Sequence, residues 1–304
     1  MTLLLEQVLN GLQFGAMLFM LASGLTLIFG IMGVVNLTHG SFYMVGAYCA
    51  AFALGKTGSF AAAVLAALLG AGGYGLLVEA TVIRRLYQRD HLYQVLATFG
   101  LILFTNEAVS LIFGRRPPLV DTPAILAGAV PLAPGFEYPV MRLAFIGIGA
   151  LVALGLWYLV NRTRVGMLVR AGADDREMVD ALGIDIRRLY ALVFGLGALL
   201  CGLAGVMAAP LLAVEIGMGE RVLITTFVVI VIGGVGSVRG AMAGALLVGM
   251  VDSLGRAYLP DFLDRLLTPE VATPLAAGLA SASIYLLMAA VLIVRPQGLF
   301  PAKP

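Results

Sequence analysis

The sequence predicts an all-α polytopic membrane protein: a single permease-like domain over residues 1–304 with about eight transmembrane segments and several broken or re-entrant helices. Two observations carry this prediction. The chain is 61% hydrophobic and only 12% charged, whereas soluble domains are roughly a quarter charged. Its mean hydropathy is +1.02, and several apolar stretches approach the roughly 20 residues that a bilayer-spanning helix needs. The 38 glycines are consistent with helices that pack closely in the lipid bilayer.

The predicted spans follow one another with short polar connections. They comprise residues 8–35, 42–54, 60–83, 95–113, 143–160, 189–212, 222–254 and 274–294. No Lys or Arg precedes the first apolar stretch, so we interpret it as a retained span and not as a cleaved signal peptide.

Arginines predict the orientation of these spans. They gather in the short loop 84–91, in the polar segment 161–188 and, with Lys303, in the tail after residue 294. Because positive charge marks cytoplasmic loops, all three segments are expected inside, and the segment 115–142 outside. The stretch 222–254 must then begin and end on the outer side. At about 33 residues, or roughly 50 Å as a helix, it is too long for one crossing.

Two breaks in the apolar pattern combine small and polar residues. The first contains Asn36, His39, Gly40 and Ser41, and the second contains Gly233, Gly234, Ser237, Arg239 and Gly240. Similar interruptions in both halves of a transporter point to its substrate route, so these residues are the predicted translocation pathway. For the second break, a tight turn between two helices at the cytoplasmic surface explains the glycines equally well.

The segment 161–188 carries six arginines and five acidic residues between two spans. A short amphipathic helix is expected over 174–182, with Asp174 and Glu177 forming a capping box, Arg176 paired with Asp180, and Gly183 ending the helix. This helix is interpreted either as a docking helix for a cytoplasmic partner or as a solvated loop helix.

Enzyme chemistry finds little support in the sequence. No GxxxxGK[ST] phosphate-binding loop is present, and histidine occurs only at positions 39 and 91. Cys49 and Cys201 lie in apolar runs and are expected to be packing residues. An intramembrane serine protease would have to pair Ser237 with His39.

A net charge of +2 gives no reason to expect a nucleic-acid partner. An ion-coupled secondary transporter would rely on Glu107, an acid well inside a predicted span.

The first break, with the run GIMGVVNLTHGSFYMVGAY, resembles the signature of the smaller permease subunit of high-affinity branched-chain amino acid ABC transporters. The segment 161–188 is similar to the cytoplasmic loop of that family at Arg170, Asp175, Ala181 and Gly183. The glycine cluster from Gly233 and the tail RPQGLF also resemble the family, and the likeness extends from about residue 8 to residue 300.

This resemblance implies a multi-pass transport subunit of the bacterial inner membrane that imports branched-chain or related amino acids and is not itself an enzyme. It implies a second permease, two cytoplasmic ATPases and a periplasmic substrate-binding protein as partners. ATP and Mg²⁺ would be bound by the ATPases, and this chain would bind no cofactor or metal. The residues expected to contact the ATPases are Arg170, Asp174, Asp175, Met178, Val179, Ala181, Leu182 and Gly183.

Overall fold

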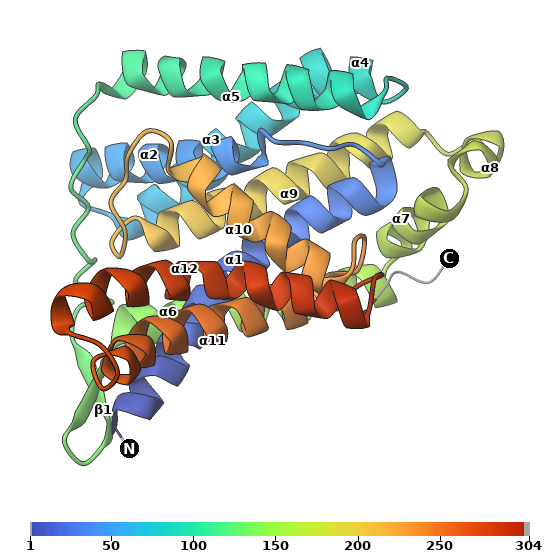
Figure 1. The fold of residues 1–304 in the computed structure, drawn as a ribbon. Coiled ribbons are helices and arrows are strands. Elements are labelled where there is room, and N and C mark those ends of the chain that lie inside the picture. The colour runs from blue at the N-terminus through green and yellow to red at the C-terminus, as the bar shows by residue number, and fades with distance from the viewer. Residues whose placement is uncertain (1, 301–304) are drawn as a thin grey trace.

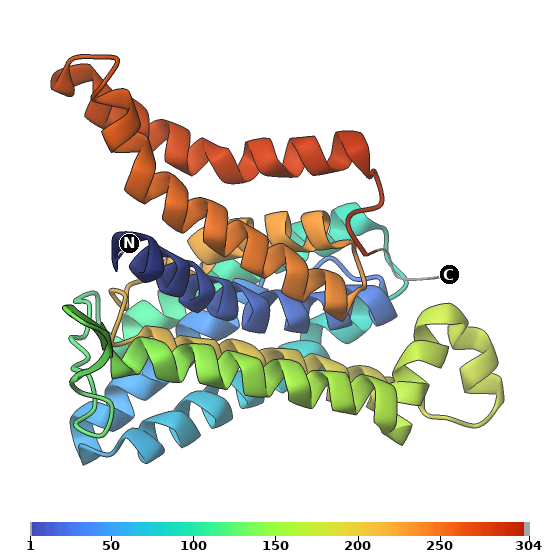
Figure 2. The same ribbon diagram turned by 90° about the horizontal axis from the view of Figure 1, so that it is seen from below.

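The computed structural model describes residues 2–300, apart from the side chains of residues 176, 177, 269 and 270. Within that range the chain forms a bundle of helices that run roughly side by side (Figures 1 and 2). In chain order the elements are α1 (Thr2–Met32), α2 (His39–Thr57), α3 (Phe60–Val78), a π-helical turn (Glu79–Ile83), α4 (Arg84–Leu86), α5 (His91–Phe113), β1 (Ala129–Ala133), β2 (Phe136–Pro139), α6 (Val140–Arg162), α7 (Arg164–Asp174), α8 (Arg176–Ala181), α9 (Ile186–Ala208), α10 (Met218–Gly233), α11 (Val238–Leu263) and α12 (Pro269–Val294).

Seven helical stretches of the described chain are long and apolar enough to cross a membrane, which confirms the predicted polytopic α-helical class. Two shorter helices, α2 and α10, complete the bundle. The 16 residues of α10 span only about 24 Å, less than the roughly 30 Å of a bilayer core. The predicted stretch 222–254 is thus two helices, α10 and α11, joined by a tight turn at residues 234–237.

The two ends of the bundle differ in charge. In Figure 1, α4, α7, α8 and the end of α12 lie at one end, and β1 and the start of α1 lie at the other. The arginine-rich segments 84–91 and 161–188 therefore share one end, which the distribution of positive charge marks as cytoplasmic. The outer end carries an antiparallel hairpin of β1 and β2 that the all-α prediction did not foresee.

Small residues bring the helix backbones together in the centre of the bundle. A Cβ atom on Gly24 of α1 would lie 2.9 Å from Gly197 Cα in α9, and one on Gly46 of α2 would lie 2.6 Å from Gly202 Cα. Gly15 of α1 faces α11 in the same way, where a Cβ atom would lie 3.0 Å from the Ala245 carbonyl oxygen. The close packing that the glycine spacing indicates is therefore present, and α1 is the central helix.

The segment 161–188 folds differently from its prediction. Instead of one helix over 174–182, it forms α7 and the short α8, and the N-cap of α8 is Asp175 and not Asp174. Asp175 Oδ1 accepts a hydrogen bond from Met178 N at 3.0 Å, and its extended backbone separates the two helices. Gly183, with φ of 81°, lies just after the end of α8 and stops the helix as predicted. The predicted capping box with Glu177 and the predicted pair of Arg176 with Asp180 involve side chains that lie outside the described residues.

The end of the described chain packs against the α10–α11 turn. Leu299 N donates to Ile232 O and Phe300 N donates to Gly233 O, both at 2.9 Å. Gly234 has φ of 103°, and a Cβ atom there would lie 2.9 Å from Phe300 O. These contacts explain why glycine is needed at this turn.

Candidate functional site

The start of α2 lies inside the bundle and not at its surface. After α1 ends at Met32, residues 33–38 return as non-helical chain, and α2 begins at His39. His39 Nε2 lies 3.0 Å from Leu21 O, and Leu21 is 11 residues, or about 16 Å, from the cytoplasmic end of α1. Figure 1 shows this segment running back along the bundle between α1 and α5. Helices interrupted at such a depth are a recurring feature of transporters.

Hydrogen bonds from α5 hold the returning segment in place. Gln94 Oε1 accepts from Val35 N at 3.0 Å, and Thr38 Oγ1 donates to Thr98 O at 3.1 Å. Asn36 is fully buried, and its Oδ1 accepts from Thr38 N at 3.0 Å. Non-helical backbone can lie at membrane depth because these partners satisfy it within the protein.

His39 connects three helices at the centre of the bundle. Its Nε2 contacts Leu21 O of α1 and lies 3.0 Å from Cys201 Sγ of α9, and its ring meets the Phe42 ring edge to face at 6.0 Å. The residue is fully buried. His39 therefore fixes the first turn of α2 relative to α1 and α9.

The first turns of the two short helices meet beside His39. A Cβ atom on Gly40 of α2 would overlap the carbonyl of Gly219 in α10, and one on Gly219 would overlap the carbonyl of Gly40. Glu220, in the first turn of α10, accepts a hydrogen bond from Asn106 Nδ2 of α5 at 2.6 Å. Sequence reasoning missed Gly219, Glu220 and Asn106, because no local pattern links residues so far apart in the chain.

The second predicted break lies elsewhere. Gly233 and Gly240 pack against each other across the α10–α11 turn, and Ser237 caps α11 by accepting from Gly240 N at 3.1 Å. The alternative of a tight turn between helices thus describes this segment, and it sits at the cytoplasmic end beside Gly30 of α1. The structure does not bring the two predicted sets of pathway residues into one cavity.

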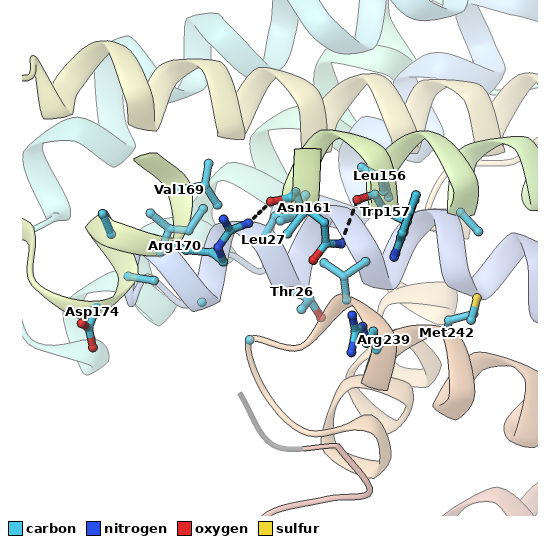
Figure 3. A pocket seen from close by; sticks show the side chains of 18 of the residues that line it. Thr26, Leu27, Leu156, Trp157, Asn161, Val169, Arg170, Asp174, Arg239 and Met242 are labelled. Carbon is cyan, nitrogen blue, oxygen red and sulfur yellow. Dashed lines mark hydrogen bonds between the residues drawn. The ribbon is translucent and has the colours of Figure 1, made fainter. Parts of the chain in front are cut away.

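Arg239 alone among the predicted pathway residues lines the large cavity at the cytoplasmic end. This cavity of about 760 Å³ lies between α1, α6, α7 and the start of α11 (Figure 3). Thr26, Trp157, Asn161 and Arg170 also line it. Asn36, His39, Gly40 and Ser41 are instead buried within the bundle.

At the cytoplasmic end, α7 and α8 project beyond the bundle (Figure 2). Thr163 Oγ1 caps α7 by accepting from Gly166 N at 3.2 Å, and a Cβ atom on Gly166 would overlap the last carbonyls of α6. The chain can therefore turn sharply from α6 into α7. Nearly all residues predicted to contact an ATPase are exposed here: Arg170, Asp174, Asp175, Met178, Ala181, Leu182 and Gly183.

Val179 differs from the other residues of this predicted surface. Its side chain is 3% exposed, whereas Met178 is 58% and Leu182 is 70% exposed. The apolar strip expected on one face of the helix is thus divided: Val179 anchors α8 on this chain, and Met178 and Leu182 face outward.

A buried carboxylate joins the cytoplasmic ends of α3 and α9. Glu79, 1% exposed, accepts from Arg84 Nη2 at 2.8 Å and from the Tyr87 hydroxyl at 2.5 Å. The Tyr87 and Tyr190 rings meet edge to face at 5.1 Å, and the Tyr190 hydroxyl donates to Ile31 O at 3.3 Å. Burial, together with the hydrogen bond to Glu79, raises the pKa of the Tyr87 phenol, so it stays protonated near neutral pH.

The residues that an ion-coupled transporter or an intramembrane serine protease would use are not arranged for that chemistry. Glu107 is 64% exposed on its side chain and lies 3.9 Å from Arg115, so it is not a buried ion-binding acid. Ser237 Oγ is engaged at the start of α11, and His39 is enclosed by α1 and α9 in the bundle centre. This geometry favours neither the ion-coupled transporter nor the serine protease.

Comparison with known proteins identifies the relatives of the chain. The family model described as branched-chain amino acid transport system / permease component matches residues 7–294. The chain is 30% identical over 269 residues to the high-affinity branched-chain amino acid transport system permease protein BraD of Pseudomonas aeruginosa, covering 84% of this chain and 88% of that protein.

Two further relatives extend the comparison. LivH of Salmonella typhimurium, described in the same words as BraD, is 32% identical over 269 residues, covering 84% of this chain and 87% of that protein. The ribose import permease protein RbsC of Escherichia coli is 23% identical over 268 residues, covering 82% of this chain and 77% of that protein. No solved structure matches the chain.

Proposed function

The chain belongs to the family of branched-chain amino acid transport system permease components, and from this membership we propose that it is the membrane subunit of an ATP-driven importer of branched-chain or related amino acids. It is a multi-pass protein of the inner membrane. ATP and Mg²⁺ are bound by two separate cytoplasmic ATPases, and a second permease and a periplasmic binding protein complete the assembly. This chain contributes the membrane route and no catalytic residue.

The structural observation that supports the ATPase partners is the form of the segment 161–188 at the arginine-rich end. The helices α7 and α8 extend from the bundle and expose Met167, Met178 and Leu182, at 55%, 58% and 70%. A helix as short as α8 is marginal in water, so a partner that covers its apolar side chains would stabilise it. An apolar groove on an ATPase suits this shape, because short amphipathic helices dock in grooves through such anchors.

The same segment is connected to the transmembrane helices on both sides. Through α9 and the hydrogen bond from the Tyr190 hydroxyl to Ile31 O it reaches the end of α1, where residues 33–38 begin their return into the bundle. A shift of α8 caused by closure of the ATPases would be passed to the centre of the bundle along this path. In this proposal the membrane route opens to each side in turn when α1, α2 and α10 move relative to one another at their glycine contacts.

The names of the relatives support the proposed substrate and direction. The names of BraD and LivH specify branched-chain amino acids, and the name of RbsC specifies import. We assign the same direction and amino acid class to this chain. Selection of the substrate is assigned largely to the binding protein, which delivers it to the outer end of the bundle.

Substitution of the two outward-facing anchors tests the proposal. The double variant Met178→Asp, Leu182→Asp places charge where an apolar contact is expected but leaves Val179 packed. In the reconstituted assembly we expect normal levels of the permease pair, with ATPase no longer bound, or bound without stimulation of ATP hydrolysis by loaded binding protein. A desolvated, unpaired charge costs several kcal/mol, or about 3–5 when fully buried.

Leu92→Asp is the matched control, since Leu92 is 73% exposed at the start of α5, at the same end of the bundle but outside the segment 161–188. It should leave uptake of radiolabelled leucine and stimulated ATP hydrolysis unchanged. If the double variant also keeps both activities, the segment is a solvated loop helix and the coupling hypothesis is wrong.

A further inference from the structure

We propose that the cytoplasmic cavity between α1, α6, α7 and the start of α11 binds an anionic phospholipid of the inner leaflet, with its phosphate beside Arg239. The cavity is large, at about 760 Å³, and two arginines, an asparagine and a threonine line it together with many apolar side chains. Figure 3 shows Arg170 and Asn161 toward the α7 side of the cavity, Arg239 across from Asn161 and Trp157, and Met242 further along α11. An amphiphile with a negative head fits this lining.

The depth of the cavity corresponds to the headgroup region. Trp157 lies in the last turns of α6, and the Arg162 guanidinium is 5.9 Å from the centre of its ring. Tryptophan and arginine concentrate where a helix leaves the hydrocarbon core. Asn161, between them, has its Nδ2 bonded to Trp157 O at 2.8 Å. A ligand phosphate at the level of Asn161 therefore lies at the depth of lipid phosphates.

The polar lining favours an anion. Arg239 is exposed at the start of α11 and forms no ion pair with any residue that the structure describes. Arg170 donates to Val160 O and keeps its charge within the cavity, and Asp174 is the one acidic residue of the lining. The net charge of the lining is therefore positive. Basic pockets between transmembrane helices on the cytoplasmic side bind anionic lipid headgroups.

A buried hydroxyl adds a second, independent sign of a ligand. Thr26 lines the cavity from α1, its side chain is fully buried, and its Oγ1 has no hydrogen-bond partner among the described residues. Figure 3 shows its oxygen directed toward the side of the cavity where Arg239 lies. Because a buried polar atom without a partner costs free energy, a bound ligand that accepts this hydrogen bond would remove that cost.

The apolar lining separates a lipid from a free anion. Phe19, Leu156 and Met242 continue the lining toward the bilayer centre, since they precede Thr26 on α1, precede Trp157 on α6 and follow Arg239 on α11. Two residues of the lining, Trp157 of α6 and Met242 of α11, are themselves 45% and 41% exposed. A lipid can therefore enter the cavity between α6 and α11 and leave an acyl chain against the apolar wall. Inorganic phosphate would leave that wall uncovered.

The chain carries its own reporter for this site, since Trp157 is its single tryptophan. The full-length chain is placed in detergent micelles that contain phosphatidylglycerol or phosphatidylcholine with dibrominated acyl chains, which quench tryptophan fluorescence on contact. We expect brominated phosphatidylglycerol to quench Trp157 saturably at low mole fraction, and brominated phosphatidylcholine only in proportion to its mole fraction. Equal quenching by the two lipids would overturn the proposal.

Two variants and a control locate the site. Arg239→Gln should lower the apparent affinity for phosphatidylglycerol about tenfold, through loss of one charge-assisted hydrogen bond. Thr26→Val should lower it about threefold, on the scale of one neutral hydrogen bond. Arg85→Gln removes the same charge from an exposed position at the same end, outside the cavity, and should leave the quenching unchanged. If Arg239→Gln also leaves it unchanged, the assignment of the phosphate to Arg239 is wrong.

A competition experiment distinguishes a lipid phosphate from free inorganic phosphate as the ligand of this cavity. Excess inorganic phosphate should not displace brominated phosphatidylglycerol, because the acyl chain adds apolar contact that the free ion lacks. Displacement by inorganic phosphate at a concentration similar to that of the lipid would show that the cavity takes a free anion, and the lipid assignment would be overturned.

Discussion

At the scale of single residues, Glu79 shows how a helix defect places a charge. Glu79 and Arg84 are five residues apart, a spacing that would separate them on an α-helix. The π-helical turn from Glu79 to Ile83 widens the helix, so that Arg84 Nη2 and Nε bond the carboxylate at 2.8 and 3.2 Å. Such turns occur often at functional positions. Here the turn lies between the apolar part of the span and the arginine-rich loop.

We expect Glu79→Ala to destabilise the purified chain by about 1–3 kcal/mol, because it leaves the Tyr87 hydroxyl without its acceptor, whereas the half-exposed Arg84 can still be solvated. Tyr87→Phe removes one hydrogen bond to the carboxylate and should cost about 1–3 kcal/mol. Tyr93→Phe is the control, since Tyr93 is 62% exposed. Thermal unfolding in detergent measures all three. A Tyr87→Phe variant as stable as Tyr93→Phe would show that the hydroxyl contributes nothing.

At the scale of elements, the sequence predicted which segments break but not how the broken ends meet. The polar residues around Asn36 and His39 are visible in one short run, and the structure confirms that the helix pattern is interrupted there. The partner of Gly40, however, is Gly219, and only the folded bundle brings them together. The error at 174–182 has a local cause, because Asp174 and Asp175 are equally good caps and Thr163 starts an additional helix ahead of them.

The contact between α2 and α10 predicts a sharp difference between two glycine substitutions. Gly40→Ala places a methyl group against the Gly219 carbonyl and should cost about 1–3 kcal/mol, with loss of uptake, because backbone must shift. Gly147→Ala in α6 meets nothing within 4 Å and should be neutral or stabilise its helix by up to about 1 kcal/mol. Thermal unfolding and leucine uptake measure the pair. Equal effects would mean that the close approach of α2 and α10 does not limit the fold.

At the scale of the whole molecule, the distribution of arginine and the arrangement of helices agree on one topology. From the N-terminus at the outer end, α1 runs inward, α9 runs outward and α10 runs inward again from within the bundle (Figure 1). Residues 222–254 therefore begin and end toward the outer side, as the count of crossings from the arginine-rich loops requires. The depth at which α2 and α10 start could not be predicted, since hydropathy reports composition along the chain and not position across the bilayer.

Single cysteines can test this topology in a Cys49→Ala, Cys201→Ala background. We expect Ala213→Cys and Asp264→Cys to react with a membrane-impermeant thiol reagent from outside, because both are exposed and lie in the α9–α10 and α11–α12 connections at the outer end. Leu182→Cys and Val235→Cys should react only after the membrane is opened. Labelling of Ala213→Cys and Asp264→Cys from opposite sides would contradict the arrangement of α10, α11 and α12.

The hydrogen bonds from Leu299 and Phe300 to Ile232 and Gly233 also affect the order in which parts of the fold are completed during synthesis. During translation, α10 and α11 leave the ribosome before α12 and well before residues 299 and 300. Until those residues emerge, the last carbonyls of α10 lack the partners they have in the finished protein. The α10–α11 turn is therefore among the last parts of the molecule to be completed. A chain cut short within α12 would keep α10 and α11 but leave this junction without its two closing hydrogen bonds.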